Sequence, residues 1–61
     1  MRIPPALKTP DEGKKIEFWT TGMQQKHDER GILGWFKEGI FWSEDRCDHW
    51  SQREIKGWAY L

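Results

Sequence analysis

The stretch from Gly31 to Trp42 constrains the fold more than any other part of the sequence. Two apolar and aromatic runs, Ile32 to Phe36 and Ile40 to Trp42, flank the short polar segment Lys37-Glu38-Gly39. Glycine adopts the positive φ angles that a tight turn requires, so a glycine-containing break between two such runs favours a β-hairpin. The stretch therefore predicts a central hairpin around which a small β domain is organised.

Two further segments alternate as strands do. Lys14 to Thr21 places Ile16 and Phe18 on one face and Trp19 on the other, and Arg53 to Leu61 places Ile55 on one face and Trp58 on the other. In the hairpin, one face is expected to close a core with Ile16, Phe18 and Ile55. The second face of the hairpin is expected to carry Leu33, Trp35 and Phe41. A short chain covers that second face only by curling its sheet or with help from a partner.

The segments between the expected strands are less regular. Residues 1–13 hold all three prolines and are expected to form an extended, proline-containing N-terminal segment, from which Leu7 reaches the core. Thr9 to Gly13 has the composition of a turn. Residues 22–30 show no apolar periodicity and are interpreted as a mobile loop. Residues 43–52 begin with Ser43, which is a typical residue at a helix start. A short helix and an ordered loop are equally compatible with the sequence of this segment.

These segments predict a mainly β fold in a single small domain, residues 1–61. The expected architecture is a three- to four-stranded antiparallel meander, either a curled sheet or a small SH3-like barrel, with at most a short helix near 43–52. A chain of 61 residues buries only about 60% of the surface that its unfolded form exposes. Cys47 is the sole cysteine, so no disulfide forms within the chain. Nine aromatic residues are the available core material.

Charge and hydropathy narrow the classes of partner. Ten basic and ten acidic residues cancel and are interspersed, which argues against a nucleic-acid partner because no basic stripe follows a phosphate backbone. No apolar run approaches the roughly 18 residues of a membrane span, and residues 1–5 do not resemble a signal peptide. A lone cysteine fits a reducing compartment. The expected location is cytoplasmic, without membrane contact.

The triplet Cys47-Asp48-His49 is the one constellation that resembles a reactive site. A structural zinc site takes four ligands, and the chain offers no second cysteine and only His27 as a further histidine. The triplet also lacks an evident oxyanion arrangement for a cysteine nucleophile. We therefore expect no metal, no cofactor and no catalytic residue, and interpret the protein as non-enzymatic.

The surplus of aromatic residues is the remaining functional signal. The more general explanation is that these residues form the hydrophobic core. The alternative is a contact surface, because tryptophan and tyrosine dominate binding hot spots. The candidate binding residues are Trp19, Trp35, Trp58 and Tyr60, taken to lie together on one exposed face, with Trp19 and Trp58 as first choices. Such a face would bind a protein partner or mediate self-association.

The order of short motifs resembles a known family. Pro5-Ala6-Leu7 and the turn at residues 9–13 precede a strand, Gly34-Trp35-Phe36 and Gly39-Ile40-Phe41 follow, and Ile55 to Trp58 lie near the end. This order resembles small phage- and prophage-encoded domains, in particular the domain of unknown function 551. The acidic insert around Asp45 departs from that pattern. The resemblance implies a phage accessory gene product and carries over no catalytic residues.

Two functional hypotheses follow. The first is a non-enzymatic phage or prophage accessory protein in the host cytoplasm, which binds a protein and thereby modulates a host factor. The second is an SH3- or Tudor-like module that binds a peptide or single-stranded nucleic acid through exposed aromatic side chains. The second hypothesis predicts a change in tryptophan fluorescence on titration with oligonucleotides or peptides, and flat titrations would exclude it.

Overall fold

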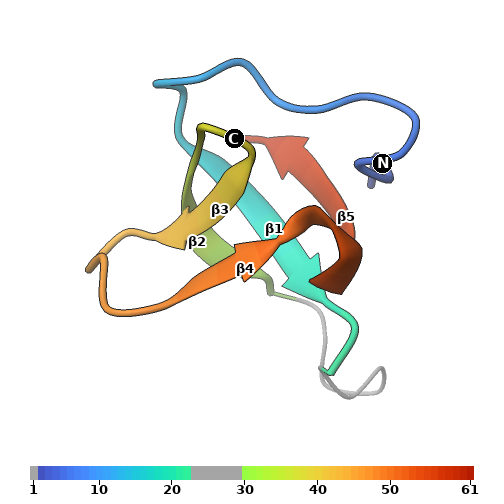
Figure 1. Ribbon diagram of the computed structural model, residues 1–61. Coiled ribbons are helices and arrows are strands. Elements are labelled where there is room, and N and C mark those ends of the chain that lie inside the picture. The colour runs from blue at the N-terminus through green and yellow to red at the C-terminus, as the bar shows by residue number, and fades with distance from the viewer. Residues whose placement is uncertain (1, 23–29) are drawn as a thin grey trace.

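The computed structural model describes residues 2–22 and 30–61. The predicted mobile loop, 22–30, therefore lies almost entirely outside the described residues. Within them the chain forms five strands and one short 3-10 helix (Figure 1). The elements are β1 (Ile16–Thr20), β2 (Ile32–Lys37), β3 (Ile40–Ser43), β4 (His49–Ser51), η2 (Gln52–Glu54) and β5 (Ile55–Tyr60).

The strands form one sheet in the order β4-β3-β2-β1-β5, and every neighbouring pair is antiparallel. The edge strands β4 and β5 follow each other in sequence and are joined by η2 alone. Because three residues connect opposite edges, the sheet must curl (Figure 1). The curl does not close, since no ladder pairs β4 with β5 among the described strands. The predicted mainly β, curled antiparallel fold is confirmed, and β4 is an additional strand within residues 43–52.

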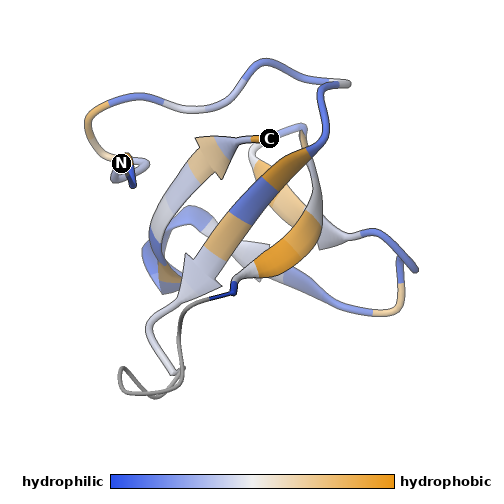
Figure 2. Ribbon diagram, turned by 180° about the vertical axis from the view of Figure 1, so that it is seen from behind, coloured by the Kyte–Doolittle hydropathy of each residue, from blue (hydrophilic) through white to orange (hydrophobic). Residues whose placement is uncertain are grey.

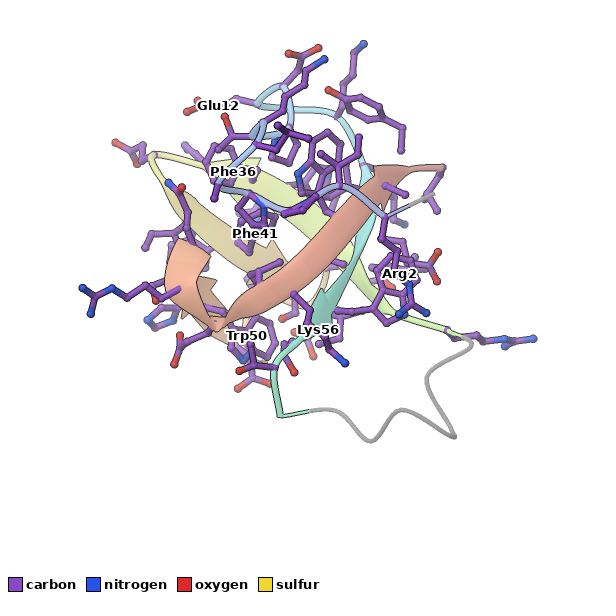
Figure 3. The ribbon with its side chains drawn as sticks, turned by 90° about the vertical axis from the view of Figure 1, so that its right-hand side faces the viewer. Arg2, Glu12, Phe36, Phe41, Trp50 and Lys56 are labelled. Atoms are coloured by element: carbon purple, nitrogen blue, oxygen red, sulfur yellow. The ribbon has the colours of Figure 1, made fainter. Side chains whose placement is uncertain are left out.

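The inner face of the curl holds the core. Hydropathy alternates over the first part of β1, as the sequence predicted (Figure 2). The ring of Phe41 lies with its centroid 5.3 Å from that of Phe18 and 4.9 Å from that of Phe36. Figure 3 shows Phe36, Phe41 and Trp50 following one another through the interior. The buried cluster consists of Ile16, Phe18, Phe36, Phe41, Ile55 and Trp58.

The central hairpin is present with a tighter turn than the sequence indicated. Only Glu38 and Gly39 lie between the strands, with φ angles of 53° and 80°. Two successive positive φ angles are typical of a type I′ turn, whose twist matches that of the flanking strands. Lys37 therefore belongs to β2, and Phe36 pairs with Phe41 on the inner face. The assignment of Phe41 to the second face was wrong because the loop has two residues instead of three.

Gly34 allows β2 and β3 to approach each other closely. It pairs with Ser43, and a Cβ atom at this position would overlap the backbone carbonyl oxygen of Trp42. The nearest atoms to such a Cβ all belong to the backbone of Trp42 and Ser43. Any side chain at position 34 would therefore separate the two strands.

A β-bulge changes which residues of β5 face inward. Trp19 pairs with Gly57 while Thr20 pairs with Ile55, so Lys56 is the extra residue in the ladder. The bulge brings both Ile55 and Trp58 to the core. Simple alternation had placed these two residues on opposite faces, and that assignment was wrong because alternation fails at a bulge.

The N-terminal segment crosses the open side of the curl (Figure 1). The backbone of Ile3 exchanges two hydrogen bonds with that of Trp58, at 2.7 and 2.9 Å, which adds a bridge to the free edge of β5. Ile3 packs against the core, whereas Leu7 is 80% exposed. The prediction for Leu7 was wrong because the Lys8 amide closes a turn onto the carbonyl of Pro4, which leaves Leu7 outside the core.

Candidate binding groove

Two of the predicted contact residues are buried. Trp58 is 0% exposed and Trp19 is 4% exposed. Trp58 pairs with Phe18 on the inner face, whereas Trp19 lies on the outer face beneath the Arg2 guanidinium, which is 4.0 Å from the ring centroid. The prediction that both are exposed on a shared face was wrong, because pairing with β1 turns Trp58 inward and the N-terminal segment covers Trp19.

Tyr60 is 40% exposed but is engaged within the protein. Its ring packs edge-on against Trp58, with centroids 4.8 Å apart. Its hydroxyl oxygen accepts a hydrogen bond of 3.0 Å from the backbone N–H of Asp11. These contacts give Tyr60 the structural role of fastening the N-terminal segment to the end of β5.

Trp35 occupies the outer face of β2, where Trp42 of β3 is its direct cross-strand partner. Trp42 in turn pairs with His49 of β4, and their ring centroids are 5.0 Å apart. Both tryptophans are half-buried. The sequence prediction missed Trp42 as a site residue. The signal that identifies it is the two-residue turn, which sets Trp35 opposite Trp42.

A groove of about 520 Å³ runs beside these two rings. It lies where the β2–β3 hairpin meets the turn before β1, and Glu12 fixes that junction by accepting a 3.0 Å hydrogen bond from the Glu38 backbone N–H. The volume is within the range of small-ligand sites. The residues lining this groove are Gly13, Trp35, Phe36, Lys37, Glu38, Trp42 and Arg46.

The charged rim of the groove is mixed. Lys37 and Arg46 are both exposed, and no carboxylate among the described residues forms an ion pair with either. Lys15 is different: its ammonium lies 5.9 Å from the ring centroid of Trp35 and 3.2 Å from a carboxylate oxygen of Glu44. Two cations are thus available to a ligand at the rim.

The turn after β3 positions Arg46. Its backbone N–H donates a 2.9 Å hydrogen bond to the carbonyl of Ser43, and its φ angle is 62°. The Ser43 hydroxyl donates to the Asp45 carboxylate at 2.5 Å, and the Cys47 backbone N–H donates to the same oxygen at 2.9 Å. These two hydrogen bonds hold the pKa of Asp45 below its ordinary value of 3.8, and the bond from the Ser43 hydroxyl has the larger effect. The Asp45 carboxylate therefore stabilises the turn that presents Arg46.

The triplet at residues 47–49 does not converge on a reactive centre. Cys47 is exposed, the Asp48 backbone N–H donates to the Ser43 hydroxyl at 3.2 Å, and the His49 ring packs against Trp42. Over the part of the chain that the structure describes, no three His, Cys, Asp or Glu side chains cluster as metal ligands do. The described residues also contain no helix of the length and apolar character needed to cross a membrane.

Comparison with known proteins identifies no relative of this chain. No family model matches the chain, and neither a curated protein nor a solved structure matches it significantly. The resemblance to the domain of unknown function 551, and with it the phage origin, stays a prediction. The groove itself is therefore the feature from which a function can be inferred.

Proposed function

We propose that this protein is a non-catalytic module that binds another protein through the groove beside Trp35 and Trp42. The observation that carries the proposal is the pairing of these two rings on the outer face, half-buried, against a groove of about 520 Å³. Tryptophan supplies a large and rigid contact area at low entropic cost, which is why it is common at interface hot spots. The hypothesis of a protein-binding accessory factor is retained, with a new set of contact residues.

The surroundings of the groove support a prearranged contact surface. The two rings project from paired strands, and the Glu12–Glu38 hydrogen bond fixes the hairpin turn at one end. Rigid elements reduce the entropy that binding must overcome. A protein partner is favoured over single-stranded nucleic acid because Glu38 lines the groove, and Glu44 and Asp45 directly precede Arg46 in the sequence. These carboxylates would repel a continuous phosphate backbone.

Site-specific photocrosslinking tests this function. A photoreactive amino acid at position 37 on the rim, in the full chain expressed in its source cells, is expected to form a crosslink to a protein. Trp42→Ala in the same chain should abolish the crosslink, because it removes half of the aromatic surface. Crosslinks between two copies would identify the partner as the protein itself.

The matched control carries the photoreactive group at position 53, an exposed site on η2 that does not line the groove. It is expected to give no Trp42-dependent product. Equal products at positions 37 and 53, or a product at 37 that survives Trp42→Ala, would contradict a protein contact at the groove. Crosslinks to nucleic acid alone would replace the proposal with the second hypothesis.

A further inference from the structure

We infer that the groove takes an extended, proline-rich peptide segment that carries an acidic side chain, an inference that rests on the proposed protein-binding function. Three observations lead to this class of ligand. They are two indole donors that no described residue bonds, the shape of the aromatic floor, and two rim cations without an ion-pair partner among the described residues. Each restricts the chemistry of the occupant in a different way.

The first observation concerns hydrogen bonding. The indole N–H of Trp58 donates to the Lys8 carbonyl at 2.8 Å, whereas no described residue accepts a hydrogen bond from the indole N–H of Trp35 or Trp42. The backbone groups of both residues lie in the β2–β3 ladder. The residues that line the groove therefore include two indole donors without an acceptor among the described residues, and Trp35 and Trp42 present no free strand edge. This lining calls for a ligand with available acceptors instead of an added β-strand.

A polyproline II segment meets that requirement. Its backbone makes no internal hydrogen bonds, so its carbonyl oxygens are available as acceptors, and proline has no backbone N–H that needs a partner. The conformation is already extended before binding, which lowers the entropic cost of association. A peptide without proline would also bring backbone N–H donors, for which the lining offers one carboxylate, that of Glu38.

The second observation is the shape of the floor. Trp35 and Trp42 are direct partners on neighbouring strands, which places their side chains about 5 Å apart at the Cβ atoms. Their half-buried rings and the groove beside them form an aromatic-lined channel. Proline rings pack well against such aromatic surfaces, and this is a general mode of polyproline II recognition.

The third observation is the charge of the rim. Lys37 and Arg46 have no ion-pair partner among the described residues, while Glu38 lines the same groove. Arginine pairs with a single carboxylate in a bidentate geometry. One acidic side chain on the ligand would neutralise this rim. A chain of phosphates would in addition meet Glu38 and the acidic turn at residues 44–48.

A direct binding measurement tests the inference. The probe is a fluorescent peptide of Pro-Pro-Glu repeats, compared with Ala-Ala-Glu and Pro-Pro-Lys repeats of equal length and with an oligo-dT strand. Fluorescence anisotropy with the full chain is expected to show the Pro-Pro-Glu peptide binding at least tenfold more tightly than the other three probes. In nitrogen-15 spectra, the indole N–H signals of Trp35 and Trp42 should shift on binding, while that of Trp58 stays in place.

Two sets of variants locate the contacts. Trp35→Phe and Trp42→Phe keep an aromatic ring but remove the donor, and each should weaken Pro-Pro-Glu binding about fivefold. The matched control is Trp50→Phe, because the Trp50 ring lies inward against Phe18. This variant should leave binding unchanged. Lys37→Gln with Arg46→Gln should remove the preference for glutamate over lysine repeats, whereas Arg53→Gln should preserve it. Circular dichroism melts establish that each variant is folded.

The outcomes separate this inference from the proposed function. Equal affinity for Pro-Pro-Glu and Ala-Ala-Glu peptides, or unshifted indole signals, would overturn the inference, while a Trp42-dependent protein crosslink at position 37 would still support the function. Oligo-dT binding that shifts the Trp35 and Trp42 signals, with no protein crosslink, would overturn both. Proline-dependent binding without glutamate preference would overturn the assignment of the acidic side chain.

Discussion

The indole Nε1–H of Trp58 donates a 2.8 Å hydrogen bond to the backbone carbonyl of Lys8, which lies 50 residues earlier in the chain. Trp58 is fully buried, so this bond satisfies a polar group that water does not reach. Together with the backbone bonds between Ile3 and Trp58, it fastens the N-terminal segment across the open side of the sheet. The N-terminal segment is thus part of the structure that excludes water from the core.

Trp58→Phe should loosen that segment. The change removes the bond to Lys8 and some ring volume, so we expect the free energy of unfolding to fall by about 1–3 kcal/mol. Tryptic cleavage after Lys8 should accelerate more than the loss of global stability requires, because the segment opens locally. Urea unfolding and timed proteolysis measure the two effects. Unchanged cleavage after Lys8 in a destabilised variant would show that the bond does not hold the segment.

Gly34→Ala should lower the stability of the protein far more than the addition of one methyl group usually does. The added methyl group would overlap the Trp42 carbonyl, a backbone atom that moves only if β3 moves. We expect a loss of about 2–4 kcal/mol in unfolding free energy, comparable to large core substitutions. Gly22→Ala is the control, because nothing lies within 4 Å of a Cβ at that position. Similar midpoints in urea for the two variants would argue against the close strand approach.

The parts of this fold that depend on local alternation were predictable. Ile16 and Phe18 face inward, and Trp35 lies opposite that face, as the period of a strand requires. The hairpin was visible because Gly39 marks a turn between apolar runs. These features depend on neighbours in sequence, and strand geometry fixes them once the strand is recognised.

The errors arose where distant segments decide the outcome. Trp19 is buried because Arg2 covers it, and nothing in the sequence of β1 indicates that the N-terminal segment lies there. Ile55 and Trp58 share the core because a bulge at Lys56 offsets the ladder between β1 and β5. Trp42 was missed because its value as a site residue depends on the register of the two-residue turn. Contacts between segments, and shifts of register, are set by packing of the whole chain.

Glu38→Asn should stabilise the protein. Glu38 occupies the left-handed region at φ 53°, where most residues are strained by about 1–2 kcal/mol and asparagine is far better tolerated. Asn-Gly is the preferred pair for a type I′ turn, and the backbone N–H that bonds to Glu12 is kept. We expect a gain of about 0.5–1 kcal/mol in unfolding free energy. Lys37→Asn, at an extended position, is the control and should not stabilise; a gain of equal size there would contradict the turn assignment.

The turn that presents Arg46 should weaken in acid because of Asp45. The Ser43 hydroxyl, followed by the Cys47 N–H, lowers the pKa of Asp45 in the folded state. A group with a depressed folded pKa contributes stability in full above its unfolded value, here near 3.8, and loses it as the pH falls through the lower folded value. The turn should therefore remain ordered at neutral pH and loosen below about pH 4.

Nuclear magnetic resonance titration of the Cys47 amide and the Asp45 carboxyl group measures this transition. Ser43→Ala removes the largest cause of the shift and should raise the pKa of Asp45 toward its ordinary value, while Asp45→Asn should abolish the transition at the Cys47 amide. Asp11→Asn, at an exposed site distant in sequence, is the matched control and should leave the Cys47 transition in place. If Asp45 titrates identically with and without the Ser43 hydroxyl, that hydrogen bond does not set the charge of the turn, and Arg46 is positioned by the backbone alone.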